Sequence, residues 1–279
     1  MEKKEIWINF ISLSTIFIEI LSSTWEILSK ATWFLYEYRD NIYMITNKHV
    51  VTGRNIETWK LLSKTWAIPE KLRLYIPNSP KTPEWKMFFR YIINEIDIFE
   101  ENWKEKYLTH ENNKVDVVAF KFNIISWSKK VYLPINKNDF SNFNIQVSDN
   151  VFIIWYPVWI VWWNWSHKLP IWKRWNVASE PQIDYWNLPR FIIDTSTREW
   201  MSGSPVIWRH DWVITNWKNW EMLGNDYIWV HYNFVWIYSW RLFSNSWDDF
   251  VTQLWIVWKK EVIEEILNAE EPFRKQHLA

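Results

Sequence analysis

The chain has 279 residues, of which 48% are hydrophobic and 23% are charged, which is the composition of a globular protein rather than a disordered one. Lysine and arginine together number 32, as do aspartate and glutamate, so no net positive charge attracts the chain to nucleic acid. The absence of cysteine excludes disulfides and thiolate metal sites, and the length suits one large all-β domain or two smaller ones.

The first apolar run, around residues 11–18, is predicted to be a β-strand because its larger apolar residues alternate with serines. The alternative is a secretory signal, since two lysines precede the run. Glu19 lies at the end of the run, and no clear small-residue cleavage site follows. No apolar stretch reaches the ~20 residues of a membrane helix. We therefore expect no membrane span and a cytoplasmic protein, with secretion as the alternative.

Short runs rich in Ile, Val, Phe and Tyr follow one another along most of the chain, separated by polar or turn-like segments. Examples are "NIYMITNKHVV", "KVDVVAFKF", "NVFIIWYPV" and "RFIIDTS". Many brief strands of this kind favour a sandwich or a pair of barrels over an α/β fold. Two longer segments, 81–113 and 159–187, are predicted to be excursions on the surface.

The last predicted element is a helix in "KKEVIEEILNAEE", where Val262, Ile263, Ile266 and Leu267 recur at helical spacing. The fold class is therefore all-β with one C-terminal helix. The stretch 134–147 marks a boundary between two halves of similar size, 1–140 and 141–279, which together are expected to form one domain.

Tryptophan occurs 27 times and glycine only 3 times, although a chain of this length ordinarily carries roughly 20 glycines. Many tryptophans follow Asn or Asp, as in "NW" and "DW", where glycine would form a tight turn because it adopts positive φ without steric cost. We interpret most of them as glycines encoded by UGA, a codon that some bacterial codes read as glycine and others as tryptophan. The alternative is a truly tryptophan-rich protein with aromatic binding surfaces. The interpretation need not extend to Trp258.

Three residues are candidates for chemistry. His49 ends an apolar strand just before a turn that contains Gly53, and Asp116 precedes another apolar strand, with Asp97 as its rival. Ser202 lies in the bend "WMSGSPV". Each residue alone has an ordinary structural explanation as a strand-end or turn residue. The histidines lack the close spacing of a zinc site, so neither a metal nor a cofactor is expected.

Together these segments resemble the chymotrypsin-like serine proteases, especially the bacterial trypsin-like peptidases without disulfides. The residues that carry the resemblance are "ATWFLY", "ITNKHVV", "VDVVAFKF", "IIWYPVWI", "LPIWKRWNVAS" and "DTSTREWMSGSPVI", within residues 30–268. The chain order His, Asp, Ser is also that of the chymotrypsin type. The resemblance implies two six-stranded antiparallel β-barrels, the first with His49 and Asp116 and the second with Ser202 and the terminal helix.

The same resemblance assigns roles to residues. Ser202 would be the nucleophile, His49 its general base and Asp116 the group that orients the imidazole. The backbone N–H groups of Trp200 and Ser202 would form the oxyanion hole, although the family has glycine at the first position. Substrate-binding positions would be Ser196 at the floor of the primary pocket, and Ser239 and Trp240 on its wall.

The leading hypothesis is a serine endopeptidase that acts on polypeptides, with esterase activity as a further capability of the same triad. One alternative is an inactive relative that binds peptide or protein partners in the cleft between the barrels, which a genuine Trp200 would favour. Another is a carbohydrate- or nucleic-acid-binding module with exposed tryptophans, which the zero net charge disfavours. No pattern indicates the oligomeric state.

Overall fold

The computed structural model describes residues 8–63, 66–78, 90–122, 134–138, 144–157, 169–194, 200–214, 217–218, 221–222, 227–241 and 254–277. Within these residues the chain is all-β with a C-terminal helix, as the sequence predicts. The strands form one curled open sheet and one closed barrel, with a small two-stranded sheet besides.

The first half of the chain forms the curled sheet of seven strands, in the order β5-β4-β1-β2-β3-β7-β6, and its strand pairs are all antiparallel. Its elements are α1 (Phe10–Ser14), β1 (Thr15–Leu21), β2 (Ile27–Tyr38), β3 (Asn41–Thr46), α2 (Lys48–Thr52), β4 (Lys71–Asn78), β5 (Arg90–Asp97), β6 (Tyr107–Thr109) and β7 (Val118–Phe122).

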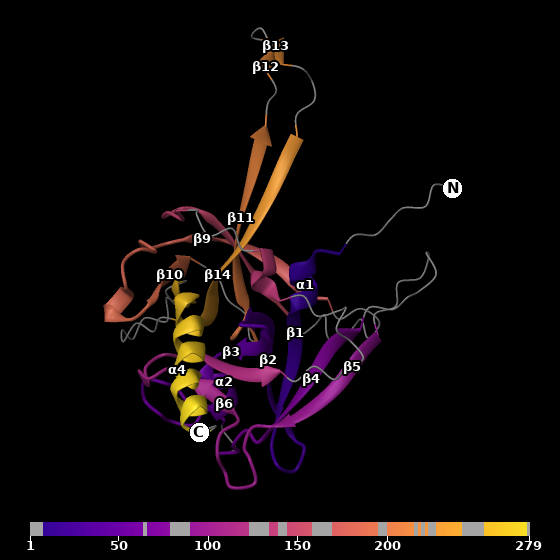
Figure 1. Ribbon diagram of the computed structural model, residues 1–279, viewed down its shortest axis with the longest axis vertical. Helices are drawn as coiled ribbons and strands as arrows, with labels where there is room; N and C mark the ends of the chain where they lie inside the picture. Colours follow the sequence, from indigo (N-terminus) through magenta and orange to yellow (C-terminus); the bar gives the residue numbers. More distant parts are fainter. Residues whose placement is uncertain are drawn as a thin grey trace, which may run out of the picture.

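The second half forms a closed antiparallel barrel in the order β10-β15-β14-β11-β8-β9. Its elements are η1 (Ile135–Asn138), β8 (Asn150–Trp155), β9 (Ile171–Val177), η2 (Tyr185–Asn187), β10 (Arg190–Asp194), β11 (Pro205–Ile214), β12 (Trp217–Lys218), β13 (Glu221–Met222), β14 (Tyr227–Arg241), β15 (Leu254–Lys259) and α4 (Glu261–His277). The long strands β11 and β14 continue beyond the barrel as a two-stranded arm, with β12 and β13 at its tip (Figure 1).

Several details differ from the sequence expectations. The first sheet has seven strands and is open, whereas the resemblance implied a closed barrel of six. The two predicted surface excursions contain strands, because β5 and β6 pair with β4 and β7, and β9 pairs with β8. The predicted first strand is confirmed from Thr15 onward as β1. The predicted boundary between residues 140 and 141 lies outside the described residues.

One hydrophobic cluster joins the two halves and the helix. It contains Phe34 and Ile45 from the first sheet, Phe234 and Ile256 from the barrel, and Ile263 from α4. In Figure 1, α4 accordingly lies along one side of the molecule beside β6 and the barrel. This shared core holds the two sheets at a fixed distance, which is what a site built from both halves requires.

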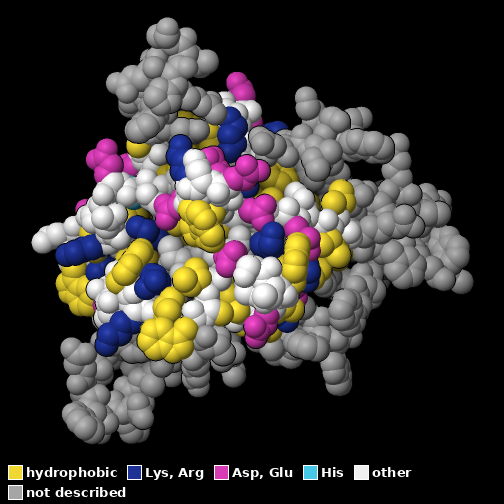
Figure 2. Space-filling view, turned by 90° about the horizontal axis from the view of Figure 1, so that it is seen from below, with side chains coloured by type: hydrophobic (Ala, Val, Ile, Leu, Met, Phe, Trp, Pro, Cys, Tyr) yellow, Lys and Arg dark blue, Asp and Glu magenta, His cyan; other side chains and the backbone are white. Residues whose placement is uncertain are grey.

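The surface carries charges of both signs. Figure 2 shows a face on which Lys and Arg side chains are interspersed with Asp and Glu, in keeping with the zero net charge of the chain. Among the residues that the structure describes, no helix is both long enough and apolar enough to cross a membrane.

Candidate active site

His49 lies in α2, the short helix that follows β3. The helix ends at Gly53, whose φ of 63° is left-handed and whose N–H donates to the His49 carbonyl oxygen at 2.9 Å. A glycine suits this position because a side chain would be strained at positive φ and because an added Cβ would lie 2.8 Å from Pro69. The turn that the sequence predicted after His49 is therefore the C-terminal cap that fixes the backbone of this histidine.

Asp116 precedes β7 and is completely buried. Its Oδ1 accepts the His49 backbone N–H at 2.8 Å, and its Oδ2 lies 2.6 Å from His49 Nδ1. Oδ2 also accepts the Ser239 hydroxyl at 2.7 Å. A buried carboxylate is stable only where hydrogen bonds replace its hydration, and Asp116 has these three donors.

This arrangement determines how the imidazole of His49 can act. An ionised carboxylate only accepts hydrogen bonds, so Nδ1 of His49 must carry the proton that lies between the two groups. In the neutral ring Nε2 is then the basic nitrogen, which can accept a proton. His49 is only 9% exposed, so a bound group could shield it fully from water.

The turn that carries Ser202 is attached to the first sheet, although it leads into β11 of the barrel. The carbonyl oxygen of Ser202 accepts the Thr32 N–H of β2 at 3.2 Å. The next residue, Gly203, donates its N–H to the side-chain oxygen of Asn47, which lies two residues before His49. The segments that carry the histidine and the serine are therefore joined by hydrogen bonds that cross from one half of the chain to the other.

Trp200 occupies the turn with a φ of 72°, in the left-handed region. Its carbonyl oxygen accepts the Thr32 hydroxyl at 3.3 Å, and its ring lies under the Lys30 ammonium, 4.8 Å from the ring centroid. A bulky side chain at positive φ is rare because Cβ approaches the backbone. The backbone here has the conformation that glycine adopts without cost.

Of the three predicted substrate-binding residues, the structure describes the side chain of Ser239 alone. Ser196 and the side chain of Trp240 lie outside the described residues. Ser239 is buried in β14, and its hydroxyl is directed to Asp116, a contact that the sequence analysis did not anticipate. Asn47 was also missed. Ser239 is distant from Asp116 in the chain, and the partners of Asn47 are distant from Asn47, so no local pattern marks either contact.

Asp97, the rival of Asp116, lies on the edge strand β5 with its side chain 55% exposed. Its carboxylate accepts the Lys71 ammonium at 2.7 Å, and this hydrogen bond holds the pKa of Asp97 below its usual value. Such an exposed pair is an ordinary surface ion pair.

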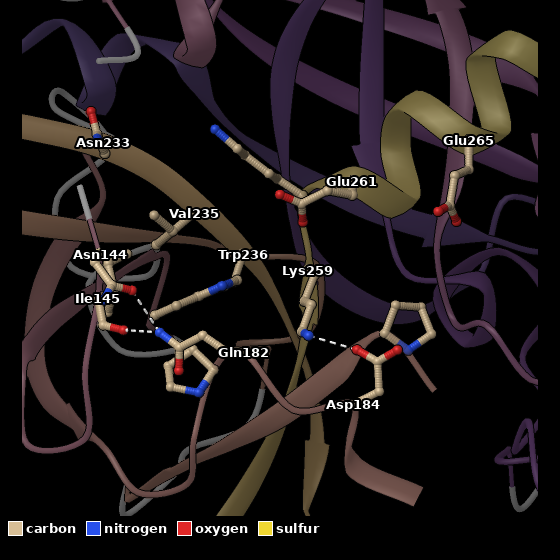
Figure 3. A pocket seen from close by; sticks show the side chains of 13 residues that line it. Asn144, Ile145, Gln182, Asp184, Asn233, Val235, Trp236, Lys259, Glu261 and Glu265 are labelled. Carbon is tan, nitrogen blue, oxygen red and sulfur yellow. Dashed lines mark hydrogen bonds and ion pairs between the residues drawn. The ribbon is translucent and has the colours of Figure 1, made fainter. Parts of the chain in front are cut away.

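A cavity of about 480 Å³ lies elsewhere, between the barrel and the start of α4 (Figure 3). Gln182 donates to the side chain of Asn144 and the carbonyl of Ile145, and Lys259 pairs with Asp184. These polar groups already bond to one another, and the cavity is not lined by His49, Asp116 or Ser202. Among the described residues, no cluster of three or more His, Asp or Glu side chains could hold a metal ion.

No protein-family model matches the sequence, and no curated protein matches it either. The structure resembles that of a serine endoprotease from Yersinia pestis, with 11% identity and a TM-score of 0.53, over 95% of this chain and 67% of that one. Two further solved structures are similar to this one, a Glu endopeptidase and the thermostable serine protease AL20 from an extremophilic microorganism. The former has 13% identity and a TM-score of 0.47 over 93% and 91% of the two chains. The latter has 9% identity and a TM-score of 0.49 over 94% and 98%. The first of these likenesses, together with the closed barrel and the curled sheet, shows that the chain has the trypsin-like fold.

Proposed function

We propose that this protein is a serine endopeptidase that hydrolyses peptide bonds through an acyl-enzyme. The observation that carries the proposal is the buried Asp116 carboxylate, which contacts both the backbone N–H and the Nδ1 of His49. A surface histidine has no need of a completely buried carboxylate, whereas a general base gains from one that fixes its tautomer and stabilises its charged form.

In this reaction His49 Nε2 removes the proton of the Ser202 hydroxyl as the serine oxygen attacks the scissile carbonyl. The resulting tetrahedral intermediate carries a negative charge on the former carbonyl oxygen, which the N–H groups of Ser202 and residue 200 would bind. The protonated His49 then gives its proton to the leaving amine, and water, activated by the same histidine, hydrolyses the ester on Ser202.

A fluorophosphonate probe tests the nucleophile directly, because it labels only a serine whose hydroxyl is activated. We expect Ser202 to be labelled, and the Ser202→Ala variant to lose labelling and to reduce kcat for peptide hydrolysis by about 10⁶-fold. The matched control is Ser204→Ala, two residues away and fully buried, which should keep its activity. Labelling that persists in Ser202→Ala would overturn the assignment.

A second candidate function is peptide binding without catalysis. The observation that favours it is the indole of Trp200, which stands at the oxyanion-hole position under Lys30. An inactive protein of this kind would bind peptides and leave the phosphonate probe unreacted, both with tryptophan at position 200 and in a Trp200→Gly variant.

We further propose that residue 200 is glycine in the protein that its own cell makes. Of the ten non-glycine residues with positive φ in the described part of the chain, six are tryptophans: Trp25, Trp59, Trp66, Trp103, Trp186 and Trp200. Tryptophan is not a residue that stabilises the left-handed region, whereas glycine enters it freely. The pattern supports a UGA codon read as glycine in the source organism.

Fragmentation of the tryptic peptide of residues 199–209, from protein made in its native cells, tests this identity. Glycine at 200 would leave the oxyanion-hole backbone free of an indole. We then expect recombinant Trp200→Gly to exceed the tryptophan form in kcat by about 10²–10³-fold, the effect of one oxyanion-hole donor. A fragment mass that corresponds to tryptophan would overturn the proposal at this position.

A further inference from the structure

Asn47 lies between β3 and α2, and its side chain is completely buried. It occupies the position just before the first residue of α2, where asparagine usually accepts a hydrogen bond from the start of the helix. Its side chain makes no such cap here. Both ends of the amide are used instead for contacts with distant parts of the chain.

The two contacts reach the neighbours of the other triad residues. Asn47 Nδ2 donates to the backbone carbonyl of Asp116 at 2.8 Å, and Asn47 Oδ1 accepts the N–H of Gly203. These partners also define the orientation of the amide, because a carbonyl can only accept and an N–H can only donate. His49 follows Asn47 by two residues, so one buried amide joins the three segments that carry His49, Asp116 and Ser202.

From this geometry we infer that Asn47 is a positioning residue for the triad, an inference that rests on the proposed function. The amide fixes where the nucleophile turn lies relative to the His49–Asp116 pair. Gly203 N–H has a second acceptor in the Tyr238 carbonyl at 3.1 Å, so the turn would stay folded without Asn47. It would then be held by its own barrel and by Thr32 of β2, and no longer to the segment of the histidine.

The test uses two variants of the full chain. Asn47→Leu removes both hydrogen bonds at similar size, and Asn47→Asp keeps the acceptor for Gly203 but loses the donor to Asp116. We expect Asn47→Leu to lower kcat by about 10²-fold, the effect of a displacement of about 1 Å, with KM for the same peptide within about 3-fold. Asn47→Asp should lie between this variant and the natural chain. Should Asn47→Leu fail to fold, Asn47→Asp carries the test with an expected fall of about 10-fold.

The matched control is Asn136→Leu in η1. Asn136 also joins its amide to a backbone N–H and carbonyl, both of Glu37, at 2.9 and 2.8 Å, and it does not contact the triad. This variant should lose stability to urea and keep its kcat per active site, with sites counted by phosphonate titration. Equal kcat in Asn47→Leu, Asn47→Asp and Asn136→Leu would overturn the inference.

A readout independent of activity separates this inference from the proposed function. The proton between His49 Nδ1 and Asp116 should give a far-downfield signal in proton NMR of ¹⁵N-histidine-labelled protein. We expect the signal to shift or broaden in Asn47→Leu and to remain in Asn136→Leu. If the natural chain resists the phosphonate, the proposed function fails, and the NMR comparison still decides the role of Asn47. An unchanged signal in Asn47→Leu would refute that role.

Discussion

Gly203 lies where the turn that carries Ser202 passes close to the first sheet. Its φ is 78°, and a Cβ added there would lie 2.2 Å from Thr46 Oγ1 and 2.3 Å from the Thr32 carbonyl oxygen. Neither neighbour can yield easily, because the Thr46 hydroxyl itself donates to that carbonyl at 3.3 Å. We expect Gly203→Ala to lower the free energy of unfolding in urea by at least about 2 kcal/mol. Phosphonate labelling of Ser202 should become slower as well, since the turn must move.

The control for this prediction is the next residue. Ser204 is fully buried, and its hydroxyl has no hydrogen-bond partner among the residues that the structure describes. Removing an unpaired buried hydroxyl is neutral or stabilising. Ser204→Ala should therefore keep or slightly raise the midpoint of urea unfolding. Similar losses in both variants would mean that the turn is sensitive to any change rather than to a Cβ at position 203.

Residues also differ in how far sequence alone reveals their role. His49, Asp116 and Ser202 become candidates only together, through their order in the chain and the resemblance of their surroundings to the chymotrypsin-like proteases, and their roles stay predictions. The part of Ser239 in holding Asp116 is not recognisable, since 123 residues separate the two partners. The sequence also does not predict which segments pair with one another as strands. The strands β5 and β9 lie in segments with a polar or irregular pattern. They are defined as strands by pairing with distant segments, β5 with β4 and β9 with β8 and β10.

At the scale of elements, tryptophans with positive φ in the connecting segments test whether these positions are glycine in the natural protein. Trp66 and Trp103 have φ values of 62° and 63°, and their side chains are 78% and 71% exposed. Left-handed backbone costs a residue with a Cβ about 1–2 kcal/mol, and the extra freedom of glycine in the unfolded chain offsets part of the gain. We expect Trp66→Gly and Trp103→Gly each to stabilise the protein by about 0.5–1 kcal/mol, as measured by urea unfolding.

Alanine at the same two positions separates the effect of the backbone conformation on stability from the effect of the tryptophan side chain. Trp66→Ala and Trp103→Ala remove the exposed ring but keep Cβ, so they should give no comparable gain. Trp258, which is fully buried in β15, gives the opposite test. Trp258→Gly should cost about 3–5 kcal/mol, because it leaves a cavity in the shared core. Stabilisation by alanine equal to that by glycine would refute the backbone explanation.

Glu19 on β1 and Tyr75 on β4 form a hydrogen-bonded pair that should make the stability of the protein depend on pH. Burial raises the pKa of Tyr75 to about 12, with help from the carboxylate of Glu19, which accepts the Tyr75 hydroxyl at 2.9 Å. An unfolded tyrosine titrates near pH 10, so the folded state keeps a proton that the unfolded state loses. Stability should therefore be constant below about pH 10 and fall as the pH rises from about 10 to about 12.

Carbon NMR of the Tyr75 ring measures this titration directly. Glu19→Gln should lower the pKa of Tyr75 and leave it above 10, because burial is the larger cause. Glu95→Gln is the control, since Glu95 bonds to Arg73 at 2.8 Å and not to the tyrosine. The proposed cause is wrong if the two variants shift the Tyr75 titration equally.

At the scale of the whole molecule, the site requires both halves to be folded at once. His49 and Asp116 come from the half of the chain that forms the first sheet, and Ser202 and Ser239 come from the half that forms the barrel. The shared hydrophobic cluster fastens these halves together, and α4 contributes its inward face to that cluster. A change in α4, which lies far from His49 and Asp116 in the sequence, should therefore destabilise the first sheet and the barrel together.

Ile263 of α4 is completely buried in this cluster, and we expect Ile263→Ala to lower the free energy of unfolding by about 2–5 kcal/mol. Ile93 on β5 is 58% exposed, so Ile93→Ala should change the free energy of unfolding by less than about 0.5 kcal/mol. Urea unfolding followed by tryptophan fluorescence, far-UV circular dichroism and loss of phosphonate labelling should give one midpoint for all three signals in each variant. If instead Ile263→Ala separated these midpoints, α4 would stabilise the barrel alone, and the first sheet would hold the His49–Asp116 pair without its help.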